Sequence, residues 1–206
     1  MTNSMPTESD CIALWDQYHT AMNVRDHLRA VCQVAMTVAR AHADKGDKID
    51  LDLVQAGALL HDLLRFVGMQ QLKLNLFKTA PSNEDLECWR DLSLKYPRLQ
   101  HAEAAALELR EREFPEELCK VVRKHDYFLI LDPIDGPVTL AEKIIYYADK
   151  RVLHDRIVSL DDRLKDGKLR YPQFATSARA ELATQAIYEL ERELFEGLKL
   201  KPEDVG

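Results

Sequence analysis

The chain has few of the features that mark a secreted, membrane-bound or disulfide-bonded protein. Its four cysteines are scattered and form no CxxC pair, so neither disulfides nor a thiolate zinc site is expected, and a reducing, cytoplasmic setting is predicted. No apolar run approaches the roughly 18 residues that span a membrane. The opening residues, MTNSMPTESD, contain no basic segment followed by an apolar one, so no secretory signal is expected.

The chain also lacks an excess of basic residues. Its formal net charge of −7 argues against duplex DNA or RNA as a partner, because proteins that bind nucleic acid generally carry a basic face. This charge does not exclude a small anionic substrate, since only the local field around a pocket matters there. The length of 206 residues suits one domain, or one domain with an appended arm.

Helical periodicity dominates the sequence, and no alternating pattern indicates a strand convincingly. The pattern predicts helices over residues 10–22, 24–43, 51–66, 99–112, 114–125 and 139–153, and a last amphipathic helix beyond Asp166-Gly167. The apolar face of this last helix carries Ile187, Leu190, Leu194 and Leu198. We interpret that stripe as core packing, with a homodimer contact as the alternative. Residues 68–100 are less regular and suggest an insertion with one short helix that could cover a pocket.

Several histidines and acids lie on or beside the inward, apolar faces of these predicted helices. His61 and Asp62 stand side by side within GALLHDLLRF, and Asp149 continues a row with Ala141 and Ile145 at the spacing i, i+4, i+8. A buried, unpaired carboxylate costs several kcal/mol, so each acid is expected to be paired, protonated or bound to metal. The histidines with this placement are His27, His61, His101 and His125. One or two divalent cations would satisfy all of these groups together.

A first metal site is expected to combine two imidazoles with two carboxylates, namely His27, His61, Asp62 and Asp149. This mixture of nitrogen and oxygen ligands suits Mn, Fe, Co, Ni or Zn, with Mg as a further option. His101 and His125 are expected to hold a second ion, with Asp62 as the bridging carboxylate and Asp126 as an additional ligand. Two ions about 3.5–4 Å apart favour in-line displacement at phosphorus.

In this order the residues resemble the H…HD…D signature of the HD superfamily (HDIG type) of metal-dependent phosphohydrolases. DHLRAVCQVAMTVARAH resembles the first metal-ligand helix, and AGALLHDLLRF resembles the LLHDIGK segment. HAEAAALEL and VVRKHDYF are similar to the two extra histidine segments of dinuclear members, and AEKIIYYADKRV is similar to the closing aspartate helix. The resemblance implies an all-α HD-domain helical bundle. We expect a single domain over residues 1–206, with a core at about 15–158 and a C-terminal helical extension at about 167–200.

The sequence departs from the family pattern at three positions. Leu64 stands where the family has the glycine of HDIG, and Arg65 replaces the lysine that faces the substrate phosphate. Arginine can contact phosphate in a bidentate way. Asp126 follows His125 where dinuclear members often have a second histidine. No GYP motif is present in the matching region, so the cyclic-dinucleotide branch is not indicated.

The resemblance implies hydrolysis of a phosphate ester by a metal-activated water, with Asp62 and Arg65 as catalytic residues. Lys124 and Lys150 flank expected ligands and could also contact an anion. The implied substrate is small, phosphorylated and nucleotide-like, and no motif specifies it further. The alternatives are a non-catalytic nucleotide-binding sensor or scaffold, and a di-iron HD-fold oxygenase. A scaffold usually lacks one metal residue and none is missing here, which favours an enzyme, and the common chemistry of the fold favours a phosphohydrolase.

Overall fold

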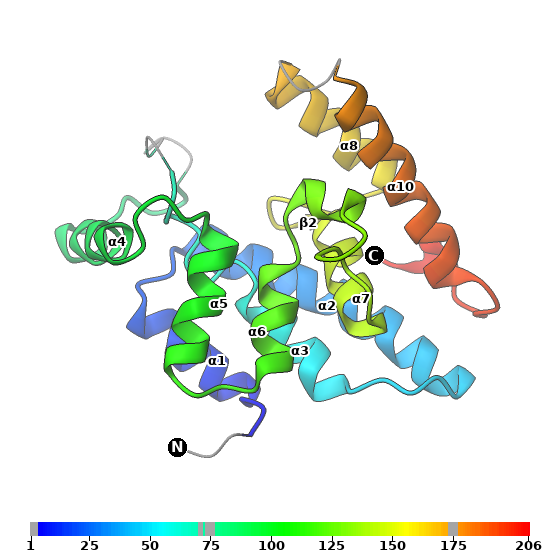
Figure 1. The fold of residues 1–206 in the computed structure, drawn as a ribbon, viewed down its shortest axis with the longest axis horizontal. Coiled ribbons are helices and arrows are strands. Elements are labelled where there is room, and N and C mark those ends of the chain that lie inside the picture. Colours follow the sequence, from blue (N-terminus) through cyan, green and yellow to red (C-terminus); the bar gives the residue numbers. More distant parts are fainter. Residues whose placement is uncertain (1–3, 70–71, 73–76, 173–176) are drawn as a thin grey trace.

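The computed structural model describes residues 4–69, 72, 77–172 and 177–206 and confirms the predicted all-α class (Figure 1). The helices are α1 (Glu8–Gln17), α2 (Met22–Lys45), α3 (Leu51–Leu60), α4 (Asn83–Lys95), α5 (His101–Glu111), α6 (Glu116–Arg123), α7 (Leu140–Asp149), α8 (Leu160–Arg170) and α10 (Ala178–Phe195), with short 3₁₀ helices η2 (Tyr127–Leu131) and η3 (Pro202–Asp204). The strands β1 (Val152–Leu153) and β2 (Arg156–Ile157) form a minimal antiparallel hairpin. Residues 70–71, 73–76 and 173–176, which fall in the predicted pocket cover and C-terminal extension, lie outside the described residues.

The long helix α2 organises the molecule. It packs against α3, α7 and the β hairpin, while α3 also packs against α1, α6 and α7. Two apolar clusters fill the interior: one joins α1, α2, α3, α4, α5 and α6, and the other joins α2, α3, α7, α8 and α10 with one residue of α6. Figure 1 shows α4 at one edge and α8 with α10 at the opposite edge. Because α2 and α3 contribute to both clusters, polar side chains that emerge between the clusters are brought together.

Helix α3 ends at Leu60, six residues before the predicted end at residue 66. Beyond it, successive i to i+3 turns replace the α-helical pattern, the first of them from Leu63 N–H to the Leu60 carbonyl. Two carbonyls in the last turn of α3 accept hydrogen bonds from side chains instead. The Ala58 carbonyl accepts from His61 Nδ1, and the Leu59 carbonyl accepts from Trp15 Nε1. The His61-Asp62 pair therefore lies at the junction of the helix and a tight turn, and not in mid-helix.

Helix α7 ends at Asp149, so the predicted helix over residues 139–153 is four residues too long. The N–H groups of Lys150 and Arg151 bond to carbonyls three residues earlier, and the chain then turns back as the β1–β2 hairpin. His154 at the hairpin turn has a φ of 60°. The periodicity missed this hairpin, because two-residue strands are too short to produce an alternating pattern.

Among its described residues the C-terminal region contains α8 and α10, where the sequence predicted a single last helix. Gly167 lies within α8 and does not break it, because an isolated glycine costs a helix only about 1 kcal/mol relative to alanine. Ile187, Leu190 and Leu194 of α10 are buried in the second apolar cluster beside α7. These three residues therefore pack within the chain, as the preferred interpretation of the stripe predicted.

Two packing features fix the positions of α3, α5, α6 and α7 relative to their neighbours. A Cβ built on Gly57 of α3 would lie 2.6 Å from both Ile145 Cδ1 and Val121 Cγ1, so α7 and α6 approach α3 through this glycine. On α5, the buried Glu108 carboxylate accepts hydrogen bonds of 2.7 Å from Tyr18, Lys95 and Tyr96. These bonds tie α5 to the end of α1 and the end of α4.

Candidate metal centre

The six side chains predicted as metal ligands come from five helices and lie mostly at helix ends. His27 is in the second turn of α2, and His61 with Asp62 follows α3. His101 is the first residue of α5, His125 lies two residues after α6, and Asp149 is the last residue of α7. Side chains at helix ends can converge on one point because each enters from its own direction. The helix packing described above brings these ends together.

The structure brings these side chains into two groups of three. In the first group, comprising His27, His61 and Asp149, His27 Nε2 is 3.1 Å from Asp149 Oδ1, and His61 Nε2 is 3.8 Å from the same oxygen. In the second, comprising Asp62, His101 and His125, Asp62 Oδ1 is 3.0 Å from His101 Nε2 and 3.3 Å from His125 Nε2. Within each group one donor atom per residue lies within 4.8 Å of the others, so each group could hold a metal ion.

Asp62 lies between the two groups. Its Oδ1 faces the second group, while its Oδ2 is 3.9 Å from both His27 Nε2 and His61 Nε2 of the first group. A carboxylate with one oxygen toward each group has the geometry of a bridging ligand. The grouping differs from the predicted four-ligand set in one respect: Asp62 makes its shorter contacts with the second group.

Backbone carbonyls orient three of the four imidazoles. His61 Nδ1 donates to Ala58 O, His125 Nδ1 to Val122 O, and His27 Nδ1 to His154 O, at 2.9, 2.7 and 2.8 Å. A carbonyl can only accept, so these rings carry the proton on Nδ1 in their neutral form, and the Nε2 lone pairs face the site. Metal-bound histidines in proteins commonly show this arrangement. His61 Nε2 is fully buried and has no hydrogen-bond partner among the described residues.

The charges at the site are set by burial and by neighbouring groups. Burial lowers the pKa of His61 to about 3, so its imidazole is neutral at neutral pH. Burial raises the pKa of Asp62, but the Arg65 guanidinium and His101 outweigh it and hold the pKa well below its usual range. Asp149 behaves in the same way, because Lys150 and His27 outweigh burial. Both acids are therefore available as carboxylates.

Arg65 and Lys150 place positive charge on two sides of the groups. Arg65 Nη1 lies 3.0 Å from His101 Nε2 and 3.5 Å from Asp62 Oδ1, and its side chain stays 37% exposed. The Lys150 ammonium is buried and donates to Asp149 Oδ2 at 2.6 Å and to the His125 carbonyl at 3.0 Å. Arg65 can therefore reach an incoming molecule, whereas Lys150 is already engaged inside.

Two other predicted contacts lie apart from the groups. Asp126 is exposed, and its carboxylate accepts from the Phe128 N–H at the start of η2. Lys124 Nζ pairs with the buried Glu142 at 3.2 Å. The structure thus gives both side chains other partners. The backbone carbonyl of His154, five residues after Asp149 in the sequence, orients His27.

The comparisons with known proteins found a family model and a relative that match the chain. The family model of the HD domain matches residues 24–165, a span that includes all six side chains. The uncharacterized protein MJ0778 of Methanocaldococcus jannaschii is 29% identical over 153 residues, covering 69% of this chain and 74% of that protein. No solved structure matches. Within the residues that the structure describes, no helix is long and apolar enough to cross a membrane.

Proposed function

The chain belongs to the HD domain family, and we propose that it is a metal-dependent phosphohydrolase. It cleaves a phosphate ester of a small, nucleotide-like substrate with a metal-activated water. The observation that carries this proposal is the position of Asp62, which presents one oxygen to each of two histidine-containing groups. This is the arrangement expected of a bridging ligand between two ions that together act on one phosphoryl group.

The donor set fits divalent metal ions. The buried Nε2 of His61 has no partner among the described residues, and a ligand position for a cation would satisfy it. Four imidazoles and two carboxylates favour Mn, Fe, Co, Ni or Zn over Mg, which prefers oxygen ligands. When bound, such ions supply a Lewis acid and lower the pKa of a bound water towards 7.

The balance of fixed charge favours an anionic substrate. When the four imidazoles are neutral, as metal ligation requires, the two carboxylates Asp62 and Asp149 are matched by the two cations Arg65 and Lys150. Each divalent ion therefore adds positive charge that the site itself does not neutralise, and a phosphate dianion would neutralise it. The protein's overall negative charge does not oppose this, because the local field decides binding in the site.

The chain's own residues are assigned different tasks. Arg65, partly exposed beside Asp62, contacts the substrate phosphate and offsets the charge that develops during displacement. Lys150 holds Asp149 Oδ2 and the His125 carbonyl, so it positions ligands and does not reach the substrate. The carbonyls of Ala58, Val122 and His154 keep three imidazoles turned with Nε2 inward.

A phosphoester assay with defined metals tests the proposal. The protein is stripped with chelator, reloaded with each divalent ion in turn, and assayed on p-nitrophenyl phosphate, bis(p-nitrophenyl) phosphate and a panel of nucleotides. We expect metal-dependent release of p-nitrophenol from the two aryl esters or of phosphate from a nucleotide, and we expect Asp62→Asn to abolish it. Oxygen uptake is measured in parallel with the iron-loaded protein.

The alternatives give different results in the same experiment. Substrate-dependent oxygen uptake without ester cleavage would identify a di-iron oxygenase. Nucleotide binding without turnover under every metal would identify a sensor or scaffold. Either result would overturn the phosphohydrolase assignment.

A further inference from the structure

The turn of the β1–β2 hairpin lies against α2 and orients one of the candidate metal ligands. The carbonyl of His154 at this turn accepts from His27 Nδ1 at 2.8 Å, and His27 Nε2 then faces Asp149 Oδ1 at 3.1 Å. His154 has a φ of 60°, a conformation that residues other than glycine adopt rarely and keep only where surrounding contacts hold it. The position of this turn therefore decides where the His27 ring points.

The base and the tip of this hairpin are held in different ways. At the base, Val152 is buried in the second apolar cluster, and its carbonyl accepts from Arg163 Nε at 2.9 Å. The tip consists of His154 and Asp155, which are both exposed. Its contacts with the rest of the described chain include the bond from His27 and an ion pair of the Asp155 carboxylate. The tip therefore depends on polar side-chain contacts and not on burial in the core.

The side chain of Lys78 joins this tip to α2. Its ammonium donates to Asp155 Oδ2 at 2.5 Å and to Asp26 Oδ2 at 2.8 Å, and Asp26 directly precedes His27 in α2. Arg29 lies 3.7 Å from the other oxygen of Asp26, whereas Asp155 pairs with Lys78 alone among the described residues. One ammonium attracts both carboxylates, which would otherwise repel each other. Without Lys78, the tip would lose its attraction to α2 and face the charge of Asp26.

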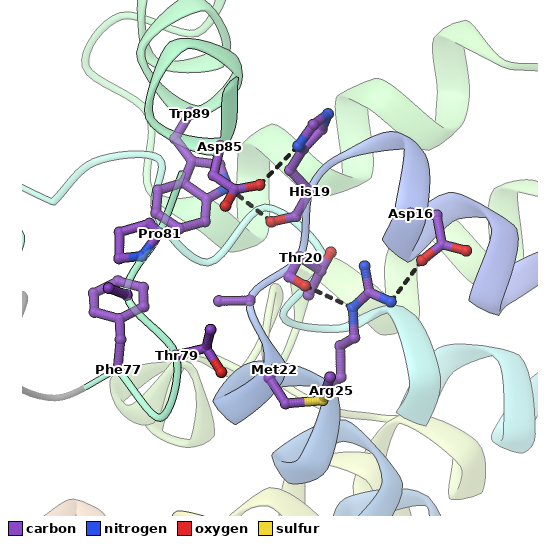
Figure 2. Close-up of a pocket in the computed structure, with 12 residues that line it drawn as sticks. Asp16, His19, Thr20, Met22, Arg25, Phe77, Thr79, Pro81, Asp85 and Trp89 are labelled. Atoms are coloured by element: carbon purple, nitrogen blue, oxygen red, sulfur yellow. Dashed lines mark hydrogen bonds and ion pairs between the residues drawn. The ribbon is translucent and has the colours of Figure 1, made fainter. Parts of the chain in front are cut away.

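An aromatic contact fixes the backbone that carries Lys78. The ring of the preceding residue, Phe77, stacks on Phe66 and on Trp89, with centroid separations of 5.4 and 5.6 Å. Phe66 and Trp89 are both buried. Figure 2 shows Phe77 beside Trp89, across a surface hollow from Met22 at the start of α2. Lys78 therefore extends from an anchored point, so its ammonium can hold the hairpin tip in place.

From these contacts we infer that Lys78 is a positioning residue for the candidate metal centre. It holds the hairpin tip against α2, and the His154 carbonyl at that tip keeps His27 Nε2 directed at the first ligand group. Lys78 acts through the hairpin and contacts neither metal nor substrate. The inference rests on the proposed metal-dependent function. It gives a role at the metal centre to the segment before α4, which supplies none of the six ligand candidates.

The direction of the change in metal affinity separates positioning from a simple effect of charge. Lys78 is a cation, so its removal would strengthen the binding of a metal ion if only long-range charge mattered. If Lys78 positions His27, its removal weakens metal binding instead. Lys78, Asp26 and Asp155 are 46%, 29% and 37% exposed, so the two ion pairs are partly screened by water. We expect Lys78→Met to weaken manganese binding about 2- to 30-fold, the effect of losing two such pairs.

Manganese affinity and an NMR signal of the metal-free protein test this inference on the full-length chain. The affinity is measured by competition with a chelator. The NMR signal is that of the Nδ1 proton of His27, which its hydrogen bond to the His154 carbonyl protects from exchange with water, and it is assigned by its loss in His27→Asn. We expect the signal in the chelator-treated wild type and its loss through faster exchange in Lys78→Met.

Three further variants complete the test. Lys78→Arg keeps a cation between the two acids and should retain most of the manganese affinity and the NMR signal. Asp155→Asn in the Lys78→Met background removes the repulsion and offers an amide donor to Asp26, so it should recover part of both. Lys45→Met is the matched control, because Lys45 is 38% exposed and joins the far end of α2 to the Glu196 carbonyl. It should match the wild type in both measurements.

Several results would overturn the inference. These are unchanged or tighter manganese binding in Lys78→Met, an unchanged His27 signal in that variant, or an equal loss of affinity in Lys45→Met. The absence of metal binding in the wild type would instead overturn the proposed function. In that case, loss of the His27 signal in Lys78→Met would still show that Lys78 positions this ring, because the signal is measured without metal.

Discussion

Replacing Gly57 by alanine tests how closely helix packing sets the position of the metal centre. Gly57 is buried in α3, and the added Cβ would lie 2.6 Å from Ile145 Cδ1 and from Val121 Cγ1. Both contacts must open by about 1 Å to reach the usual 3.5–4 Å carbon separation. Ile145 can move its terminal methyl, but the β-branched Val121 has few rotamers in a helix, so α6 must shift away from α3.

The expected change in the free energy of unfolding of Gly57→Ala follows from two opposing effects. Extra methyl groups in a packed core cost about 1–3 kcal/mol, while alanine gains up to about 1 kcal/mol over glycine in helix propensity. We expect a net loss of about 1–2 kcal/mol, which lowers the Tm of a chain of this length by about 2–8 °C. Because α6 and α7 lead to His125 and Asp149, metal affinity should fall as well.

Thermal unfolding by circular dichroism and metal titration measure the two effects. Gly167→Ala in α8 is the matched control, because its Cβ would meet only Arg163 Nη1 at 3.9 Å. The same substitution should there raise the Tm slightly and leave metal affinity unchanged. Equal stabilisation in both variants would refute the packing argument.

Three further predictions concern single side chains. Arg65→Met should lower kcat/KM for phosphoester hydrolysis about 10²- to 10³-fold and leave the metal content unchanged, and Arg65→Lys should recover part of the activity. Wild-type kinetics in Arg65→Met would show that Arg65 has no part in the reaction. The hydrogen bonds from Lys95 and the two tyrosines outweigh burial and lower the pKa of Glu108 to about 2. Between pH 4.5, its ordinary pKa, and about pH 2 the unfolded chain therefore binds more protons than the folded chain, and the free energy of unfolding falls as the pH falls. Urea unfolding should show a flatter pH dependence in Glu108→Gln, and identical slopes would contradict this. Trp15→Phe removes the donor to the Leu59 carbonyl and should cost about 1–3 kcal/mol in urea unfolding, whereas full stability would show that this bond does not hold the end of α3.

The periodic pattern of the sequence predicted most of the helices, although not α8. It also predicted the convergence of six side chains, because inward-facing polar residues on separate apolar stripes have few ways to be satisfied. The periodic pattern did not predict the residues at which the helices end. The early ends of α3 and α7 depend on the tertiary bond from Trp15 and on the short hairpin after Asp149, and neither leaves a periodic signal. The last helix was expected to begin beyond Asp166-Gly167, but Gly167 lies inside α8, because the propensity cost of one glycine is small enough for a helix to tolerate.

The sequence also could not separate buried from exposed lysines and acids beside ligands. Lys150 points inward to Asp149 and His125, while Asp126 caps η2 at the surface, although both directly follow predicted ligands. Which way such a residue points depends on the turn that follows the helix.

Metal content of the purified protein tests the central claim most directly. Elemental analysis is performed on the wild type, on Asp62→Ala and on Asp126→Ala after loading with excess manganese and desalting. A bridging Asp62 predicts up to two ions per wild-type chain, substantial loss in Asp62→Ala and wild-type content in Asp126→Ala. Equal metal content in the wild type and in Asp62→Ala would contradict the account.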